Sequence, residues 1–165
     1  MAGTILTLER KRIDRHRLYG VVVAESDQLM LLHQNDDFQF DGYVVVRKKD
    51  ITKSLTSEGT DHCIAIMKKE GLWEPVPRSV KRLPVDSWGS LLNRFVGKVV
   101  ILEAEWTDDF YIGPVLEVQK NAVVIDYIDC CGKRMGEEKI SFRRITQVRF
   151  GGRYETMHEK YMEKE

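Results

Sequence analysis

The sequence predicts a mainly β protein of the α+β class, with two small antiparallel barrels related by duplication, a helical insert between them and a C-terminal helix. Segments rich in Val, Ile and Tyr alternate with polar turns in both the first and the last part of the chain. Landmarks of the first part return about 94 residues later, which is too long a period for a solenoid and suits two small domains. The predicted parts are a first barrel (1–56), an insert (57–96), a second barrel (97–152) and a C-terminal helix (153–165).

The chain has 165 residues, enough for one domain or two small ones. Its 26 basic and 26 acidic residues cancel, so no overall field favours nucleic acid or an anionic membrane. The N-terminal stretch lacks the pattern of a secretory signal, and no apolar run is long enough to span a bilayer. Three cysteines do not make a disulfide framework. We therefore expect a cytoplasmic protein with reduced thiols and no membrane contact.

The repeat predicts the strands of both barrels. Its matching landmarks are Leu8-Glu9 with Leu102-Glu103, Asp14 with Asp108, Tyr19-Gly20 with Ile112-Gly113 after a one-residue shift, and Ile51-Thr52 with Ile145-Thr146. Alternation predicts strands near 4–12, 18–25, 28–34, 42–48 and 53–57, and again near 97–106, 110–118, 121–129, 137–142 and 146–150. Five short strands in so short a unit favour a small barrel, because closure removes unpaired edges.

Both halves resemble a known class of small barrels. The stretches GVVVAESDQLMLLHQ and DGYVVVRKKDIT resemble the two-part motif of Sm-like proteins, within the wider SH3-like class. In the second half, IGPVLEVQKNAVVIDYIDCCG and ISFRRITQVRFG resemble it more loosely. In Sm-like proteins an Arg-Gly pair after the fourth strand and a polar residue after the second help form a nucleotide pocket. Here Arg47-Lys48-Lys49-Asp50 has no Gly, and Asp27 stands where Asn is expected.

The ending, ISFRRITQVRFGGRYETMHEKYMEK, also resembles a bacterial protein family without an assigned activity. That resemblance implies no activity for this chain. The Sm-like resemblance implies the barrel fold, while the two departures from its pocket motif argue against RNA binding.

The insert changes to a helical pattern. Ser57 or Thr60 is expected to cap a helix that runs through Lys69, with Gly71 as its stop. The proline-containing stretch LWEPVPRSVKRLPV is expected to be extended. Asp86-Ser87 then caps a second helix that ends near residue 95. Its stripe, formed by Trp88, Leu91, Leu92 and Phe95, is expected to be buried against the barrels together with Trp73.

No motif assigns an activity, so we expect no catalytic, cofactor-binding or metal-binding residue. The adjacent thiols Cys130-Cys131 are interpreted as part of a turn ending at Gly132, since structural zinc needs four ligands. The acidic pairs Asp36-Asp37 and Asp108-Asp109 are interpreted as turns, with metal or acid–base chemistry as the alternative. An enzyme built from dispersed side chains remains the third interpretation.

A basic stretch, RKRIDRHR, suggests a nucleic-acid surface on the first barrel. Its candidate residues are Arg10, Arg12, Arg15, Arg17, Arg47 and Lys48, with Tyr19 and Tyr43 as stacking faces. The alternative is a solvated strand surface whose charge is compensated by Glu9, Asp14 and Asp50.

The C-terminal helix carries a second candidate surface. Tyr154, Met157 and Tyr161 form an apolar stripe opposite charged residues. This stripe either docks on the second barrel or contacts another chain.

Neutral charge and small barrels favour a non-catalytic binding module whose partner is a protein. A regulatory adaptor or a toxin-neutralising immunity protein fits this description. An RNA- or DNA-binding protein that uses the basic surface is the alternative. The sequence leaves the oligomeric state open.

Overall fold

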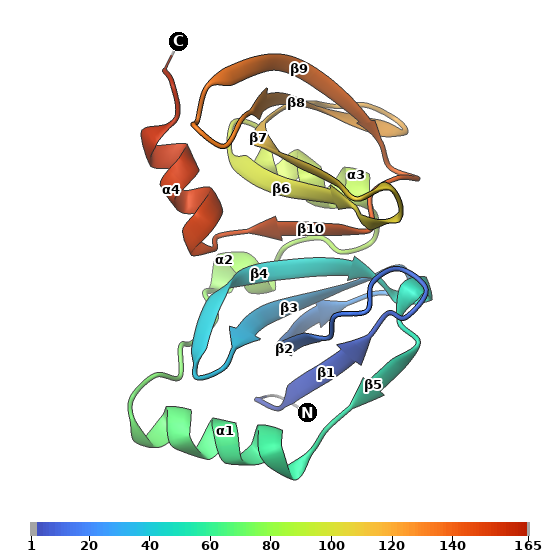
Figure 1. The fold of residues 1–165 in the computed structure, drawn as a ribbon. Coiled ribbons are helices and arrows are strands. Elements are labelled where there is room, and N and C mark those ends of the chain that lie inside the picture. The colour runs from blue at the N-terminus through green and yellow to red at the C-terminus, as the bar shows by residue number, and fades with distance from the viewer. Residues whose placement is uncertain (1–2, 165) are drawn as a thin grey trace.

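The computed structural model describes residues 3–164, and its main feature is one open antiparallel sheet of ten strands (Figure 1). The first half contributes β1 (Ile5–Glu9), β2 (Leu18–Glu25), β3 (Leu29–Asp36), β4 (Gln39–Arg47) and β5 (Lys53–Leu55). The second half contributes β6 (Val99–Ala104), β7 (Asp109–Val118), β8 (Ala122–Ile128), β9 (Arg134–Ser141) and β10 (Gln147–Phe150). The prediction of a mainly β protein is confirmed.

The strand order runs β5-β1-β2-β3-β4 through the first half and β10-β6-β7-β8-β9 through the second. Each half therefore places its fifth strand beside its first and its fourth strand at the far side. The halves meet where β4 pairs with β10, with Val45 opposite Val148. We expected two separate barrels, and this expectation is wrong, because the backbone pairing continues from one half into the other.

Irregular features recur at matching places in the two halves. A β-bulge lies between Val22 and Ala24 in β2, and another lies between Val115 and Glu117 in β7. Gly20 and Gly113 also match. A side chain on Gly20 would collide with the carbonyl of His33, and one on Gly113 would collide with the carbonyl of Asp126. The one-residue shift needed to align these glycines in the sequence agrees with the register of the sheet.

Side-chain hydrogen bonds follow the same repeat. The hydroxyl of Thr52 donates to the Glu9 carbonyl over 2.9 Å, and the hydroxyl of Thr146 donates to the Glu103 carbonyl over 3.0 Å. In both places the same threonine also donates its backbone N–H over 2.8 Å to that carbonyl. Each bond holds the fifth strand of its half against the end of the first.

Within residues 3–164, four α-helices and three 3₁₀ turns complete the fold. They are α1 (Glu58–Lys69), α2 (Arg78–Lys81), α3 (Trp88–Leu92), α4 (Arg153–Tyr161), η1 (Lys48–Asp50), η2 (Asn93–Phe95) and η3 (Glu105–Thr107). Ser57 caps α1 by accepting from the Thr60 N–H over 3.2 Å, as predicted. The extended conformation expected for residues 72–85 is wrong at α2. Its four residues contain no proline, and Pro77 precedes them as an extended N-cap residue with φ −60° and ψ 149°.

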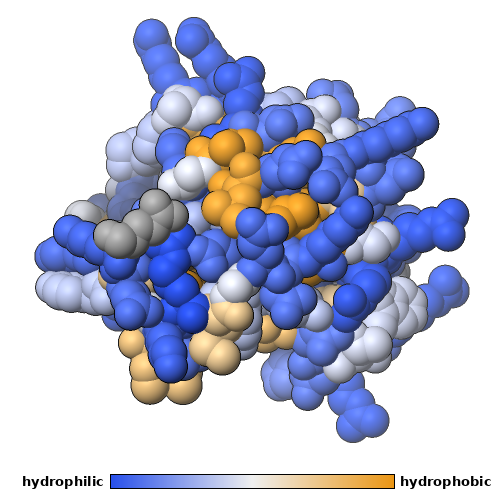
Figure 2. Space-filling view, turned by 90° about the horizontal axis from the view of Figure 1, so that it is seen from above, coloured by the Kyte–Doolittle hydropathy of each residue, from blue (hydrophilic) through white to orange (hydrophobic). Residues whose placement is uncertain are grey.

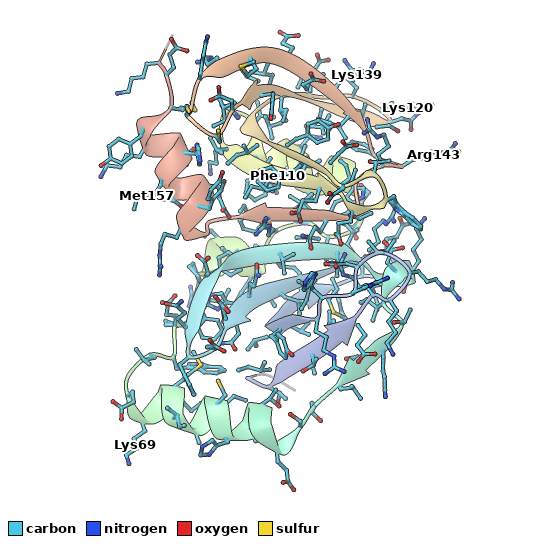
Figure 3. The ribbon with its side chains drawn as sticks, in the orientation of Figure 1. Lys69, Phe110, Lys120, Lys139, Arg143 and Met157 are labelled. Carbon is cyan, nitrogen blue, oxygen red and sulfur yellow. The ribbon has the colours of Figure 1, made fainter. Side chains whose placement is uncertain are left out.

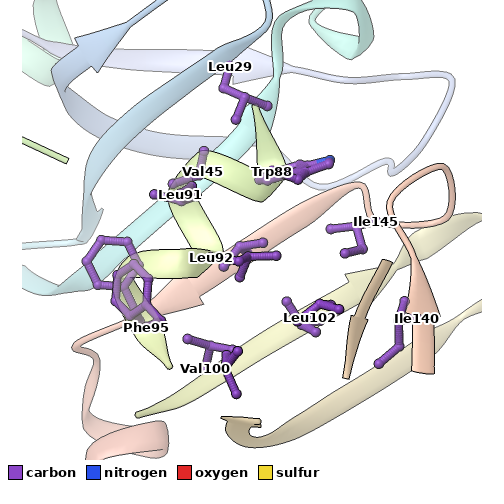
Figure 4. Close-up of a cluster of buried hydrophobic side chains, with 14 of the residues drawn as sticks. Leu29, Val45, Trp88, Leu91, Leu92, Phe95, Val100, Leu102, Ile140 and Ile145 are labelled. Atoms are coloured by element: carbon purple, nitrogen blue, oxygen red, sulfur yellow. The ribbon is translucent and has the colours of Figure 1, made fainter. Parts of the chain in front are cut away.

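The insert is built into the largest core cluster (Figure 4). Trp88, Leu91, Leu92 and Phe95 are buried, and they contact Leu29 and Val45 from the first half. The same cluster contains Val100, Leu102, Ile145 and Val148 from the second half. The predicted burial of this stripe is therefore confirmed. Trp73 is half-buried and packs edge-on against Phe40, outside that cluster.

Candidate functional site: a basic pocket between the two halves

Turns from both halves meet at one end of the sheet and enclose a pocket of about 480 Å³. The turn between β2 and β3, the η1 turn after β4, and the turn between β9 and β10 all lie on the right side of Figure 1. The pocket is lined by Asp27, Gln28, Leu29, Arg47, Lys49, Trp88, Phe142 and Arg143. We call it the junction pocket.

Backbone hydrogen bonds fix the turns that form the pocket. The Lys48 N–H donates to the Gln28 carbonyl over 2.8 Å, which joins the η1 turn to the β2–β3 turn. The Ser26 hydroxyl donates to the Val85 carbonyl over 2.7 Å and holds that turn against the insert. In the second half, the Phe142 N–H donates to the Asn121 carbonyl over 2.9 Å in the matching way. In each half, therefore, the residue after the fourth strand is hydrogen-bonded to the residue before the third strand.

Arg47 is the most enclosed charged side chain of the pocket, with 8% of its surface exposed. Its Nε donates to the Asp50 carboxylate over 2.5 Å, and its Nη1 donates to the Arg143 carbonyl over 3.2 Å. Its Nη2 is buried and has no hydrogen-bond partner among residues 3–164. A buried guanidinium N–H without an acceptor costs free energy. A ligand oxygen that accepts a hydrogen bond from Nη2 would recover that free energy.

Two further cations, Lys49 and Arg143, line the pocket and are exposed. Neither forms an ion pair within the described part of the chain, whereas the pocket's one acid is Asp27. Half-buried Phe142 adds an aromatic ring, core residue Trp88 borders the pocket with only 7% of its surface exposed, and Gln28 adds an amide that can both donate and accept. These groups match a ligand that combines negative charge with a flat ring.

The basic residues predicted on the first barrel do not gather at this pocket. Arg10 is 1% exposed and donates twice to the Glu105 carboxylate, over 2.8 and 2.9 Å, so its predicted place on the surface is wrong. Its partner lies in the other half of the chain, which no local pattern indicates. Arg17 pairs with Glu9 over 2.8 Å. Arg12 and Arg15 are exposed, with no ion pair among the described residues.

The other residues predicted for the nucleic-acid surface lie in separate parts of the first half. Arg47 lines the junction pocket, while Lys48 pairs with Glu25 over 2.8 Å beside it. Tyr19 is exposed and lines a different cavity of about 450 Å³ with Arg17. Tyr43 is half-buried and stacks on His33, with ring centroids 4.7 Å apart. Of the predicted set, Arg47 alone lines the pocket.

Sequence reasoning missed several pocket residues. They are Gln28, Phe142 and Arg143, together with Trp88, which was expected only as a core residue. Lys49 adjoins the predicted basic residues Arg47 and Lys48, and the repeat aligns it with Arg143, but neither observation indicates that Lys49 and Arg143 share one pocket. Figure 3 places Lys120 and Lys139 on the same side of the molecule as Arg143.

The predicted stripe on the C-terminal helix is open to solvent. Tyr154, Met157 and Tyr161 are 48%, 51% and 71% exposed, although α4 packs against β6 and β7. Exposed Phe110 lies edge-on to Tyr154, with ring centroids 6.2 Å apart, and extends the stripe onto β7 (Figure 3). The stripe therefore does not dock on its own sheet. We call these four residues the α4 stripe.

The adjacent cysteines lie beside the C-terminal part of α4 and next to the α4 stripe. Cys130 and Cys131 are exposed and line a cavity of about 240 Å³ with Met157, His158 and Tyr161. Within residues 3–164, no three His, Cys, Asp or Glu side chains are arranged to hold a metal ion. Hydrogen bonding and charge from Cys130 raise the pKa of the Cys131 thiol, which lowers its share of reactive thiolate.

Each acidic pair lies where a strand meets a turn: Asp36 is the last residue of β3 and Asp37 is in the turn, while Asp108 is in the turn and Asp109 is the first residue of β7. Asp37 and Asp108 adopt left-handed conformations, with φ of 53° and 57°. Asp109 accepts hydrogen bonds from Thr107 and Arg144 over 2.5 and 2.6 Å. These bonds, that from Thr107 first, lower the pKa of Asp109, so this carboxylate is committed to a local network.

A buried histidine lies away from the pocket. His33 is stacked between Phe40 and Tyr43, with ring centroids 3.9 and 4.7 Å away. Burial lowers its pKa from 6.5 to about 4, because the charged imidazolium is poorly solvated there. His33 is therefore neutral at physiological pH.

Two further observations bear on the kind of protein this is. Over the described residues, no helix has both the length and the apolar composition needed to cross a membrane. Comparison with known proteins found no matching family model, no matching curated protein and no matching solved structure.

Proposed function

We propose that the protein is a non-catalytic binding protein that holds single-stranded nucleic acid in the junction pocket. The observation that carries this proposal is the convergence of Arg47, Lys49 and Arg143 from two halves of the chain beside the half-buried ring of Phe142. Cations attract the phosphates of a flexible strand, and aromatic faces stack with its bases. Because the net charge of the chain is zero, attraction of a polyanion must come from a local group of cations such as this one.

The arrangement favours single strands over duplexes. A cavity of about 480 Å³ can take a splayed nucleotide but not the broad surface of a helix. Gln28 supplies an amide for the edge of a base, while the Nη2 of Arg47 supplies a donor for an oxygen. The missing Gly after Arg47 and the Asp at position 27 argue against the Sm-like mode of RNA binding, so the proposal depends on Lys49, Arg143 and Phe142 and not on that motif.

We also infer that the two halves arose by duplication of one SH3- or Sm-like unit. The repeated strand order, the two bulges at matching places and the Thr52 and Thr146 bonds support this inference. An experimental structure tests it by superposition of residues 5–55 on 99–150. Agreement of the five strands in order and direction is expected, while halves that curve differently would contradict the inference.

Binding of short labelled oligonucleotides tests the proposed function. We expect wild-type protein to bind single-stranded RNA or DNA better than the matching duplex, and Lys49→Glu and Arg143→Glu each to weaken binding by about tenfold or more. Lys69→Glu is the matched control, because Lys69 is an exposed cation of α1 far from the pocket (Figure 3). Equal loss in all three variants would indicate a general charge effect, and absence of binding by the wild type would reject the proposal.

A protein partner is the second candidate, and the exposure of the α4 stripe favours it. Two tyrosines, a methionine and a phenylalanine form a surface of the kind enriched in protein interfaces. Affinity capture from the native cell, with and without nuclease, separates the two candidates. Nucleic acid predicts partners that nuclease removes and that Arg143→Glu loses, whereas a protein on the stripe predicts nuclease-resistant partners that Met157→Asp loses.

A further inference from the structure

The two end strands of the sheet are a fourth strand and a fifth strand, and a fourth and a fifth strand also pair at its centre. At the centre, β4, the fourth strand of the first half, pairs with β10, the fifth strand of the second half. The sheet ends with β9, the fourth strand of the second half, and with β5, the fifth strand of the first half. Each of these end strands pairs on one side only within the described chain. An unpaired strand edge is a template for backbone pairing with another chain.

A glycine of β9 strengthens this correspondence. Arg47 and Ser141 both pair with the first residue of the preceding strand, so β4 and β9 can be counted back from them. Gly42 and Gly136 then fall at the same position, and both have positive φ, at 69° and 106°.

The surroundings of the two glycines differ. Gly42 needs its missing side chain, because a Cβ there would collide with the backbone of Gly152 at the start of α4. Gly136 has nothing within 4 Å of that position. The free edge strand β9 therefore has the same backbone feature that the paired strand β4 needs at Gly42, although no part of the described chain fills the space beside the Cβ position of Gly136.

We propose that copies of this chain associate head to tail, with β9 of one copy pairing antiparallel with β5 of the next. The central pairing supplies the register, because it sets Gln147 opposite Val46 and Arg149 opposite Val44. Transferred to the free edges, the same register sets Lys53 opposite Ile140, and Leu55 opposite Glu138, of the neighbouring copy. Such a heterologous contact leaves one free edge on each end copy, so it extends to open chains or closes into a ring.

Charge supports this pairing. Lys53 of β5 and Glu137 and Glu138 of β9 are all exposed, and none forms an ion pair within the described chain. In the transferred register Lys53 lies diagonally across from Glu138 of the neighbouring copy, on the same face of the sheet. Diagonal pairs lie within reach of long side chains of opposite charge. Figure 2, which looks down on the β9 side, shows hydrophilic side chains around a small apolar patch.

Sedimentation velocity over a range of concentrations, combined with hydrogen exchange, tests the assembly on the full chain. We expect species larger than a monomer, and amide protection that rises with concentration in both β5 and β9. Protein that stays monomeric at every concentration would overturn the proposal, since the charges of β9 would then serve to protect the edge. Protection confined to β9 would also overturn it, because it would indicate a symmetric dimer.

A charge exchange tests the register. Lys53→Glu and Glu138→Lys should each raise the dissociation constant by about threefold to tenfold, as expected for exposed charges that meet a like charge. The double variant should recover wild-type association, and Lys69→Glu should not change it. Failure of the double variant to recover association, while the single variants weaken it, would overturn this register.

Discussion

Val45 in β4 lies directly opposite Val148 in β10, and both side chains are fully buried. This contact joins the two halves of the chain through backbone pairing, while the insert covers it from one side with Trp88 and Leu91. The turns that follow β4 and precede β10 are brought together as a result, and they form the junction pocket. The position of the candidate site is therefore a consequence of how the halves pair.

Trp88→Ala should destabilise the protein by about 3–5 kcal/mol, because a large aromatic side chain would be removed from a packed cluster. Trp88 is 7% exposed, whereas Trp106 in η3 is 59% exposed. Trp106→Ala is thus the matched control and should cost less than about 1 kcal/mol. Chemical denaturation measures both free energies of unfolding. Equal effects would show that the insert does not anchor the core.

Stability should fall as the pH is lowered from about 6.5 to about 4, because of His33. The folded-state pKa of His33 lies at about 4, below its ordinary value of 6.5, so the unfolded chain binds the proton first. The lost stability amounts to about 3 kcal/mol for this shift. Denaturation at several pH values measures it. His33→Phe should flatten the dependence in that window, and an unchanged slope would contradict the assignment.

Arg10→Met should destabilise the protein by about 2–4 kcal/mol, because the carboxylate of Glu105 would lose its buried partner. The two side chains come from different halves and share two hydrogen bonds. The double variant Arg10→Met/Glu105→Gln should lose less than the sum of the single changes. Strict additivity in a double-mutant cycle would show that the pair does not couple the halves.

Gly42→Ala should be more destabilising than Gly136→Ala. Both residues have positive φ, and at Gly42, whose φ of 69° lies near the left-handed α region, this conformation alone costs an alanine about 1–2 kcal/mol. Only Gly42 adds a collision with the backbone at Gly152, so its cost should rise above that range. Denaturation at low protein concentration compares the two variants as monomers. Equal losses would mean that the close approach of β4 to α4 can relax.

The sequence predicted those features that depend on neighbouring residues. Alternation located the strands, Ser57 marked the start of α1, and the spacing of Trp88, Leu91 and Leu92 indicated a buried face. The repeat was visible because its landmarks are local. In each case the physical cause lies within a few residues of the pattern.

Long-range pairing was not predictable in this way. Nothing in the period of β4 or β10 indicates that these two edges meet, and the partner of Arg10 is known only once they do. The pocket needs turns that lie far apart in the chain, so Arg47 and Arg143 could not be placed together from the sequence. The basic stretch predicts a charged surface because its cations are close together in the sequence, yet its first residue, Arg10, is buried.

The salt dependence of oligonucleotide binding tests the central claim most directly. The affinity of the wild-type protein for a single strand should fall linearly with the logarithm of salt concentration, and Arg143→Gln should reduce that slope by about 1, because one phosphate contact is lost. Lys69→Gln should leave the slope unchanged. A binding affinity that does not respond to salt, or an Arg143→Gln slope equal to that of the wild type, would contradict nucleic-acid binding at the junction pocket.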